Sequence, residues 1–161
     1  MARQKKITIG WREWVSLPTL GIAAIKAKID TGARTSALHA YDVRFVQQDG
    51  VEMVRFRVHP LQRDSRTYVE AEAPLKERRR VRSSSGHSTL RPVIQVPVEV
   101  GGRRLRIELT LTNRDAMGFR MLLGRRAIRR GILVDPGRSY LTATGPLPEP
   151  PPRPLLPPME G

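Results

Sequence analysis

The apolar residues of this chain occur in short runs, and turn-forming residues separate almost every run from the next. The segment Arg104–Leu111 shows the pattern most clearly, because its leucine and isoleucine residues alternate with arginine, glutamate and threonine. A period of two places the apolar side chains on one face of a β-strand. Many short strands separated by turns predict an all-β sandwich or a partly closed barrel. The candidate strands are Lys6–Val15, Ala24–Ile29, Val43–Gln47, Val51–Val58, Thr67–Ala73, Pro92–Val100, Leu105–Thr112 and Ile132–Val134.

Glycine and proline divide the chain further. Asp49-Gly50 and Gly101-Gly102 each predict a tight hairpin turn between two strands. Leu122–Arg130 is the one segment that predicts a helix, and it is short. Eight of the 14 prolines lie between residues 146 and 158, and proline cannot join the interior of a sheet. We therefore predict one domain over residues 1–144 and a disordered, proline-rich tail over residues 145–161.

The net charge of +14 predicts a polyanionic partner or reflects a generally basic host proteome. That partner is nucleic acid or an acidic peptide, since arginine binds phosphates and carboxylates alike. The chain contains no cysteine, which excludes disulfides and thiolate zinc sites. It also has neither a secretory-signal pattern nor an apolar segment approaching the ~20 residues that span a bilayer. We expect a cytoplasmic protein with no membrane partner.

Asp30-Thr31-Gly32 directly follows the apolar segment Ile22–Ile29 and places a carboxylate at the end of a predicted strand. Glycine permits the backbone angles and the close approach that a tight turn needs. Two such turns facing each other would bring two carboxylates together, and these would share one proton. One carboxylate can then act as a base on water while the other acts as an acid. A purely structural Asx turn is the alternative interpretation.

The segments around and after this turn resemble those of retropepsin-like aspartic proteases. More narrowly, the chain resembles the bacterial family once labelled putative ATP-dependent zinc proteases, whose members are often associated with ATP-grasp glutamate ligases. The resemblance covers roughly residues 5–143. It rests on Ile29–Ala40, Val81–Gly86, Arg91–Val93, Thr110–Met117, Met121–Arg125 and Val134–Tyr140.

This resemblance implies a small β-barrel of the acid protease type with one short helix, and it implies catalysis by Asp30, Thr31 and Gly32. Asp30 would activate water, Thr31 would hold two facing turns together, and Gly32 would leave room for the substrate. The association with ligases implies an acidic peptide or a glutamylated protein as substrate, whose polyglutamate-type tail the enzyme would trim. A functional association with an ATP-grasp glutamate ligase is the corresponding partner prediction.

A shared-proton pair requires a second carboxylate, and the chain contains a single Asp-Thr-Gly. A homodimer would supply it, with Asp30 of each subunit meeting on a two-fold axis. Asp115, in a motif of the narrower family, is the alternative partner within the chain. A turn capped by Asn113 and held by Arg114 is the structural interpretation of that motif.

Arginines near the Asp30 turn predict a cationic substrate groove. Viral retropepsins have an acidic residue where this chain has Arg34. In those proteases the arginine that follows Leu-Gly pairs with this acidic residue. Arg125 occupies the latter position here, so it needs another partner or binds substrate itself. Cations in the groove would favour carboxylate side chains, although solvated surface arginines are the alternative. The predicted substrate-binding residues are Arg34, Arg82, Arg91, Arg114 and Arg125.

The densest basic run, Lys76–Arg82, precedes Ser83–Gly86. It could form one side of a flap that closes over the groove with the serines at its tip, or a solvated face or loop of the molecule. No metal is expected, because the three histidines stand alone, and no cofactor is expected, because no phosphate-binding glycine loop is present. The alternative function is a non-catalytic basic module that binds RNA or a ribosome, although stacking aromatics are scarce.

Overall fold

The computed structural model describes residues 5–61, 64, 66–82, 85–113, 118–129 and 131–142. The predicted tail over residues 145–161 and two of the predicted site residues, Arg114 and Asp115, lie outside these ranges. The described strands are β1 (Ile7–Gly10), β2 (Arg12–Leu17), β3 (Ile22–Asp30), β4 (Ser36–His39), β5 (Tyr41–Gln48), β6 (Val51–Val58), β7 (Val69–Pro74), β8 (Glu77–Arg82), β9 (Ser88–Val100), β10 (Arg103–Thr112), β11 (Met121–Gly124) and β12 (Ile132–Asp135).

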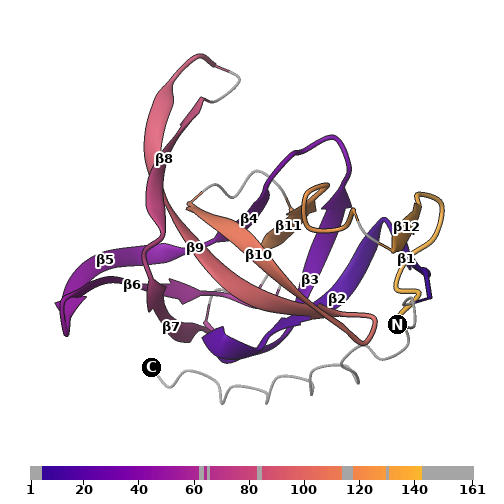
Figure 1. Cartoon of the computed structure of the whole chain (residues 1–161), viewed down its shortest axis with the longest axis horizontal. Coiled ribbons are helices and arrows are strands. Elements are labelled where there is room, and N and C mark those ends of the chain that lie inside the picture. The colour runs from indigo at the N-terminus through magenta and orange to yellow at the C-terminus, as the bar shows by residue number, and fades with distance from the viewer. Residues whose placement is uncertain are drawn as a thin grey trace, which may run out of the picture.

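Six strands close into a barrel in the order β10-β4-β11-β3-β2-β9, and β9 pairs with β10 to complete the ring (Figure 1). Its interior is filled by aliphatic side chains such as Ile25, Leu38, Ile94, Leu109 and Leu123, each completely buried. The alternation along β10 is as the sequence predicts, since Ile107, Leu109 and Leu111 belong to this core. The all-β barrel expected from the sequence is therefore confirmed.

A long hairpin, which we call the arm, extends from this barrel and comprises residues 77–82 of β8 and 88–92 of β9. The first half of β9 pairs with β8, whereas its second half, from Val93 to Val100, pairs with β10 in the barrel wall. In Figure 1 the arm and the connection between β3 and β4 both rise from the upper end of the barrel. The basic run of the sequence thus forms one strand of a projecting hairpin.

Two smaller sheets accompany the barrel. Strands β5, β6 and β7 form an antiparallel sheet, and β1 pairs in parallel with β12. Both predicted hairpin turns are present, with positive φ at Asp49, Gly50, Gly101 and Gly102 as the tight type needs. No helix in the described ranges is long and apolar enough to cross a membrane.

The sequence predicted the wrong place for the helix. Residues Met121–Gly124 form β11 instead, and the chain turns immediately afterwards. The amides of Arg125 and Arg126 bond to the carbonyls of Ala33 and Arg34, and residues 125–127 form a turn rather than a regular helix. Within the described residues the one helical element is a 3-10 turn at Pro18–Leu20.

Strand boundaries also differ from the prediction. Lys6–Val15 is divided at Trp11, because β1 leaves to pair with β12 while β2 pairs with β3. Strands β4, β8 and β11 were not predicted as strands. Two of them, β4 and β11, are only four residues long. The third carries arginine at four of its six positions, which hides any alternation of apolar residues.

Glu13 is a buried carboxylate for which the sequence predicted no role. It is completely buried and accepts hydrogen bonds from the amides of Gly10 (2.7 Å), Leu141 (2.8 Å) and Thr142 (3.3 Å). The hydroxyl of Thr142 donates a fourth bond at 2.8 Å. These bonds compensate for the cost of burying the charge and hold the segment after β12 against β2.

Candidate active site

Strand β3 ends at Asp30, whose side chain is partly exposed at the end of the barrel. Its Oδ1 accepts a hydrogen bond from the Gly32 amide at 3.0 Å, and its carbonyl accepts one from Ala33 at 3.1 Å. The Asx turn that was the structural alternative is therefore present. Among the described residues no hydrogen bond is made to Oδ2, so the turn fixes one carboxylate oxygen and leaves the other available to a water molecule or a substrate.

Neighbouring strands hold this turn in place. Gly124 at the end of β11 lies opposite Asp30 in a parallel register, and its amide donates to Ser36 Oγ at 3.0 Å. The Arg125 amide donates to the Ala33 carbonyl at 2.8 Å. Ser36 is only 2% exposed, so this clamp is inside the protein. Both Ser36 and Gly124 lie within the segments that carry the family resemblance, although the sequence predicted no role for either.

Gly124 allows β11 and the turn to approach each other closely. A Cβ atom there would lie 2.9 Å from the Ala33 carbonyl oxygen and closer still to that of Thr35. Backbone atoms on both sides cannot move away cheaply, so a side chain at this position would displace the turn that carries Asp30. Gly32 has more room, because a Cβ there would lie 3.3 Å from Asp30 Oδ1.

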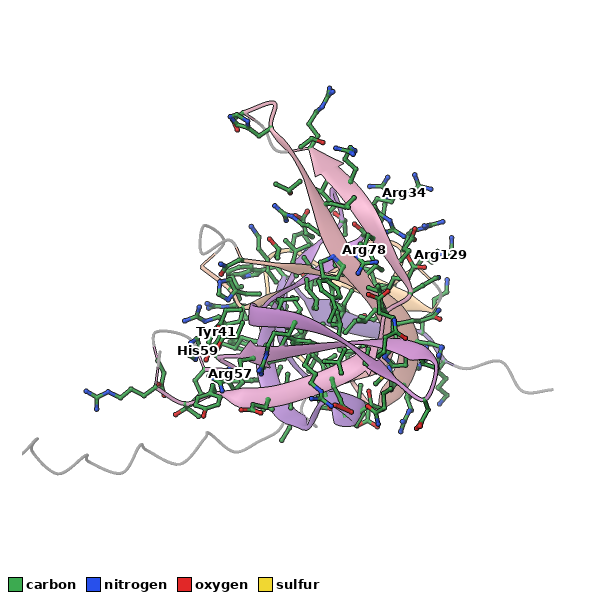
Figure 2. All side chains as sticks on the ribbon, turned by 90° about the vertical axis from the view of Figure 1, so that its left-hand side faces the viewer. Arg34, Tyr41, Arg57, His59, Arg78 and Arg129 are labelled. Atoms are coloured by element: carbon green, nitrogen blue, oxygen red, sulfur yellow. The ribbon has the colours of Figure 1, made fainter. Side chains whose placement is uncertain are left out.

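Arg34 and Arg125, two of the predicted substrate-binding residues, lie together. With Arg126 and Arg129 they line a concave surface of about 300 Å³, which we call the arginine concavity. Figure 2 shows Arg34 and Arg129 near each other at the upper part of the molecule. Arg125 also donates to the Gly32 carbonyl at 3.3 Å, so it finds its partner in the backbone of the Asp30 turn.

Two other predicted substrate-binding residues, Arg82 and Arg91, do not line the arginine concavity. Arg82 is exposed at the end of β8, on the arm. Arg91 lies on β9, where its guanidinium donates to the Thr112 hydroxyl at 2.6 Å. Arg114 and Asp115, the proposed internal second carboxylate, lie outside the described residues. Thr31, the second residue of the Asp-Thr-Gly turn, is exposed.

Sequence reasoning did not identify Arg126 and Arg129 as site residues. The signal was present in Gly124-Arg-Arg-Ala-Ile-Arg-Arg130, a basic run at the end of a matching segment. Its interpretation as a helix would have spread the arginines around a helical surface. The turn at residues 125–127 instead directs four arginines, including Arg34, to one concavity.

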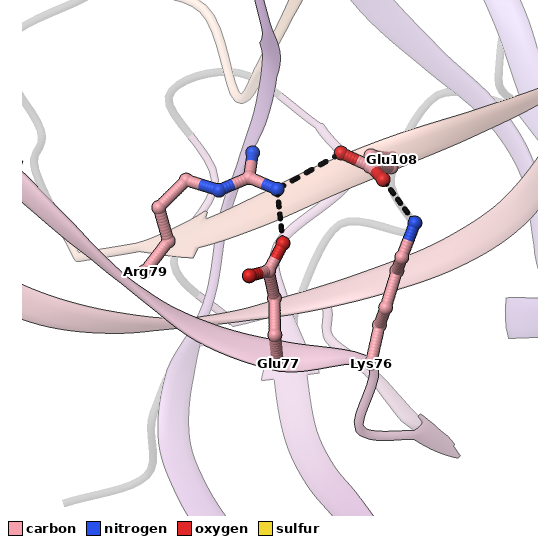
Figure 3. Close-up of polar contacts among 4 residues, drawn as sticks. All are labelled: Lys76, Glu77, Arg79 and Glu108. Carbon is pink, nitrogen blue, oxygen red and sulfur yellow. Dashed lines mark hydrogen bonds and ion pairs between the residues drawn. The ribbon is translucent and has the colours of Figure 1, made fainter.

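A network of ion pairs occupies the base of the arm (Figure 3). Glu108 on β10 accepts from Lys76 and from Arg79, the latter at 3.1 Å, and Arg79 also bonds to Glu77. The hydrogen bond from Lys76 is the main cause that lowers the pKa of Glu108, and Arg79 adds to it. The pKa of Arg79 is raised by its bonds to Glu77 and Glu108. These cations are therefore committed to protein carboxylates.

Within the described ranges, no group of three His, Asp or Glu side chains is placed to hold a metal ion. The chemistry available at the turn is that of a carboxylate with one fixed and one open oxygen, beside a basic surface. Such a carboxylate can accept a proton from water once a second acid lies near it.

Comparison with known proteins agrees with this geometry. A family model described as the retropepsin-like aspartic endopeptidase RimB matches residues 8–144. A probable alpha-L-glutamate ligase of Desulfotalea psychrophila is 52% identical over 132 residues, which are 82% of this chain and 28% of that protein. A protein of the same name from Parasynechococcus marenigrum is 49% identical over 136 residues, or 84% of this chain and 29% of that protein. The chain thus spans less than a third of the length of these relatives.

The fold also has a counterpart among solved structures. A crystal structure of a protein of unknown function from Legionella pneumophila superposes with a TM-score of 0.66 at 27% sequence identity, covering 84% of this chain and 97% of that one. The family match spans the whole barrel and includes the Asp30 turn. The chain therefore belongs to the RimB-like family of retropepsin-like aspartic endopeptidases.

Proposed function

We propose that this protein is an aspartic peptidase that hydrolyses amide bonds in acidic, glutamate-rich chains. The observation that carries the proposal is the Asp30 turn, which holds one carboxylate oxygen through the Gly32 amide and leaves the other open, in a chain of an aspartic endopeptidase family. Asp30 provides one acid of the catalytic pair, and a second copy of the chain provides the other.

In the proposed reaction the two carboxyl groups share one proton before substrate binds. The ionised carboxylate removes a proton from water, and the water oxygen attacks the carbonyl carbon of the substrate. The protonated carboxyl gives its proton to the carbonyl oxygen, which forms a tetrahedral diol. The diol then collapses and the carbon–nitrogen bond breaks. The nitrogen leaves as an amine with the proton taken from water, and one diol hydroxyl returns its proton to the other carboxylate, which restores the shared proton.

The exposed position of the turn supports a symmetric pair. Thr31 and Gly32 are exposed in the single chain, so a second copy has access to them. In the proposed dimer Thr31 ties the two turns together through its hydroxyl, and Gly32 leaves space for the substrate backbone. Asp115 remains the alternative second carboxylate.

The glutamate-rich substrate is supported by two independent features. Relatives that are 52% and 49% identical to this chain carry the name of a probable alpha-L-glutamate ligase, and this chain corresponds to part of their length. A unit joined to a glutamate-adding enzyme has a ready substrate in the product of that enzyme. The arginine concavity beside the Asp30 turn offers the cations that carboxylate side chains need.

Incubation with a peptide that ends in several glutamates, followed by mass spectrometry, tests the proposal. The wild-type protein should shorten the acidic tail, and Asp30→Asn should lower the rate by about 1000-fold or more while the far-ultraviolet circular dichroism stays unchanged. Equal cleavage by both proteins would remove Asp30 from the mechanism. No cleavage by either, together with tight binding of RNA, would favour the basic binding module instead.

A further inference from the structure

Several arginines on the sheets have carboxylate partners. Arg55 pairs with Glu72 at 3.1 Å, and Arg78 pairs with Glu52 at 2.7 Å. Arg57 lies between Asp42 and Glu70, at 3.1 Å from each. The four arginines that line the arginine concavity have no ion pair with any carboxylate in the described part of the chain, and no other described residue lines that surface.

The backbone that carries these four side chains is fixed. The Arg126 amide donates to the Arg34 carbonyl at 3.2 Å, and the Ala127 amide donates to the Gly124 carbonyl at 3.1 Å. Ile128, between the arginines, is only 4% exposed and belongs to the core. The turn and the buried Ile128 therefore fix the backbone of Arg126 and Arg129, which line the same concavity as Arg34.

Four like charges around one concavity repel each other, and a bound anion relieves that repulsion. The surface has space for an anionic group, with a volume of about 300 Å³. Asp30 does not line it, although Arg125 contacts the carbonyl of Gly32 in the same turn. An anion held there would therefore belong to a part of a bound chain that flanks the reacting bond.

We infer that Arg126 and Arg129, together with Arg34, form a subsite that binds the carboxylate of an acidic substrate side chain next to the bond being cleaved. This inference rests on the proposed function, since it names the substrate contact of the same site. Arg126 and Arg129 determine specificity and act on no reacting atom. Two or more guanidinium forks can bind neighbouring carboxylates at once, so a chain of glutamates should bind more tightly than a single glutamate.

Binding to the Asp30→Asn protein tests the subsite without any dependence on catalysis. The ligand is a tetraglutamate peptide, and isothermal titration calorimetry measures its affinity. The double variant Arg126→Gln/Arg129→Gln should bind about tenfold or more weakly. The matched control is Arg44→Gln/Arg66→Gln, which removes the same charge from exposed positions outside the arginine concavity and should change affinity by about twofold or less. A tetraglutamine peptide should not bind measurably.

Equal weakening by the two pairs of substitutions would overturn the subsite, because the effect would then come from net charge alone. Failure of the Asp30→Asn protein to bind tetraglutamate would overturn it too. In the catalytically intact protein, Arg126→Gln/Arg129→Gln should raise KM about tenfold and leave kcat within about twofold, the pattern of lost substrate binding. Selective binding through Arg126 and Arg129 without any cleavage would support the subsite and contradict the peptidase proposal, so the two can fail separately.

Discussion

At the scale of single residues, the candidate site depends as much on absent side chains as on present ones. Asp30 projects from a turn that lies against β11, and the contact is made through the Cα of Gly124. The buried hydroxyl of Ser36 accepts a hydrogen bond from the Gly124 amide. The position of the carboxylate therefore follows from backbone packing around one glycine.

Gly124→Ala should destabilise the protein by about 1–3 kcal/mol, because the added methyl group overlaps backbone carbonyls on the Asp30 turn. It should also lower peptidase activity more than stability alone explains, since the turn must move. Urea denaturation and the tail-shortening assay measure the two effects.

Gly137→Ala is the matched control for that substitution. Its nearest neighbour would be Asp135 Oδ1 at 3.6 Å, an ordinary contact, and its backbone is not in the left-handed region. The control should change stability by about 0.5 kcal/mol or less. A Gly124→Ala protein as stable and as active as this control would contradict the close packing described here.

At the scale of elements, β9 connects the barrel to the arm. Its 13 residues pair with β8 in one half and with β10 in the other, so the arm is a direct extension of the barrel wall. The ion pairs of Lys76 and Arg79 with Glu108 join the base of the arm to β10 across the shared strand. Further along, the arm has its own strand pairing, and its residues 85–90 are exposed.

Glu108→Gln should reduce stability at neutral pH by about 0.5–1 kcal/mol, because two partly exposed ion pairs are lost. The pKa of Glu108 in the folded protein lies below its ordinary value of 4.5, mainly because of Lys76. Between the two pKa values the unfolded chain binds more protons, so this stabilisation is present above about pH 4.5 and is lost as the pH falls through the folded pKa. Urea midpoints of the wild type and of Glu108→Gln, measured from pH 3 to pH 7, report this difference in stability. That is roughly the range in which carboxylates titrate.

Lys76→Met tests the assigned cause of that shift. It removes the largest favourable contact of Glu108 and should make the pH dependence of stability shallower than in the wild type. A wild-type profile that stays parallel to the Glu108→Gln profile down to the lowest pH would show that Glu108 contributes no such stabilisation.

At the scale of the whole molecule, one chain presents one Asp-Thr-Gly turn on an exposed end of the barrel. Catalysis by a shared proton then requires a second acid beside Asp30. A second copy related by a two-fold axis would provide the same turn and the same arginine concavity a second time. The proposed dimer would therefore have two equivalent arginine concavities flanking one reaction centre.

Mixing subunits tests this arrangement. At a constant amount of wild-type protein, adding an equal amount of Asp30→Asn protein should lower activity to about half, because half of the wild-type chains then have an inactive partner. A threefold excess should lower it to about a quarter. Prior incubation allows the subunits to exchange, and sedimentation confirms that the mixed species form.

Activity that does not change on mixing would contradict the dimeric site. In that case Asp115→Asn should abolish cleavage, since Asp115 would supply the second carboxylate within the chain. If activity falls on mixing and the Asp115→Asn protein is fully active, the two catalytic carboxylates are Asp30 of one subunit and Asp30 of the other.

The sequence alone determined the class of the fold and the centre of the candidate site. Alternation in Arg104–Leu111, the two glycine turns and the Asp30 turn after an apolar run are all local, so neighbouring residues suffice to specify them. The helix prediction at residues 122–130 failed where a distant contact prevailed. Residues 121–124 pair with β3 and β4, which are far earlier in the chain, and this pairing keeps them extended. The amides of Arg125 and Arg126 then bond to the carbonyls of Ala33 and Arg34.

Only the tertiary structure decided which of the many arginines belong together. The Gly124–Ser36 bond joins residues 88 apart, and the Arg125–Gly32 bond joins residues 93 apart, so no local pattern could show either. Arg78 and Arg79 are paired with glutamates on other strands, whereas Arg34, Arg126 and Arg129 converge on one concavity. The sequence gives the number of charges. The free energy of each charge depends on its neighbours in space, and the closure of the barrel determines those neighbours.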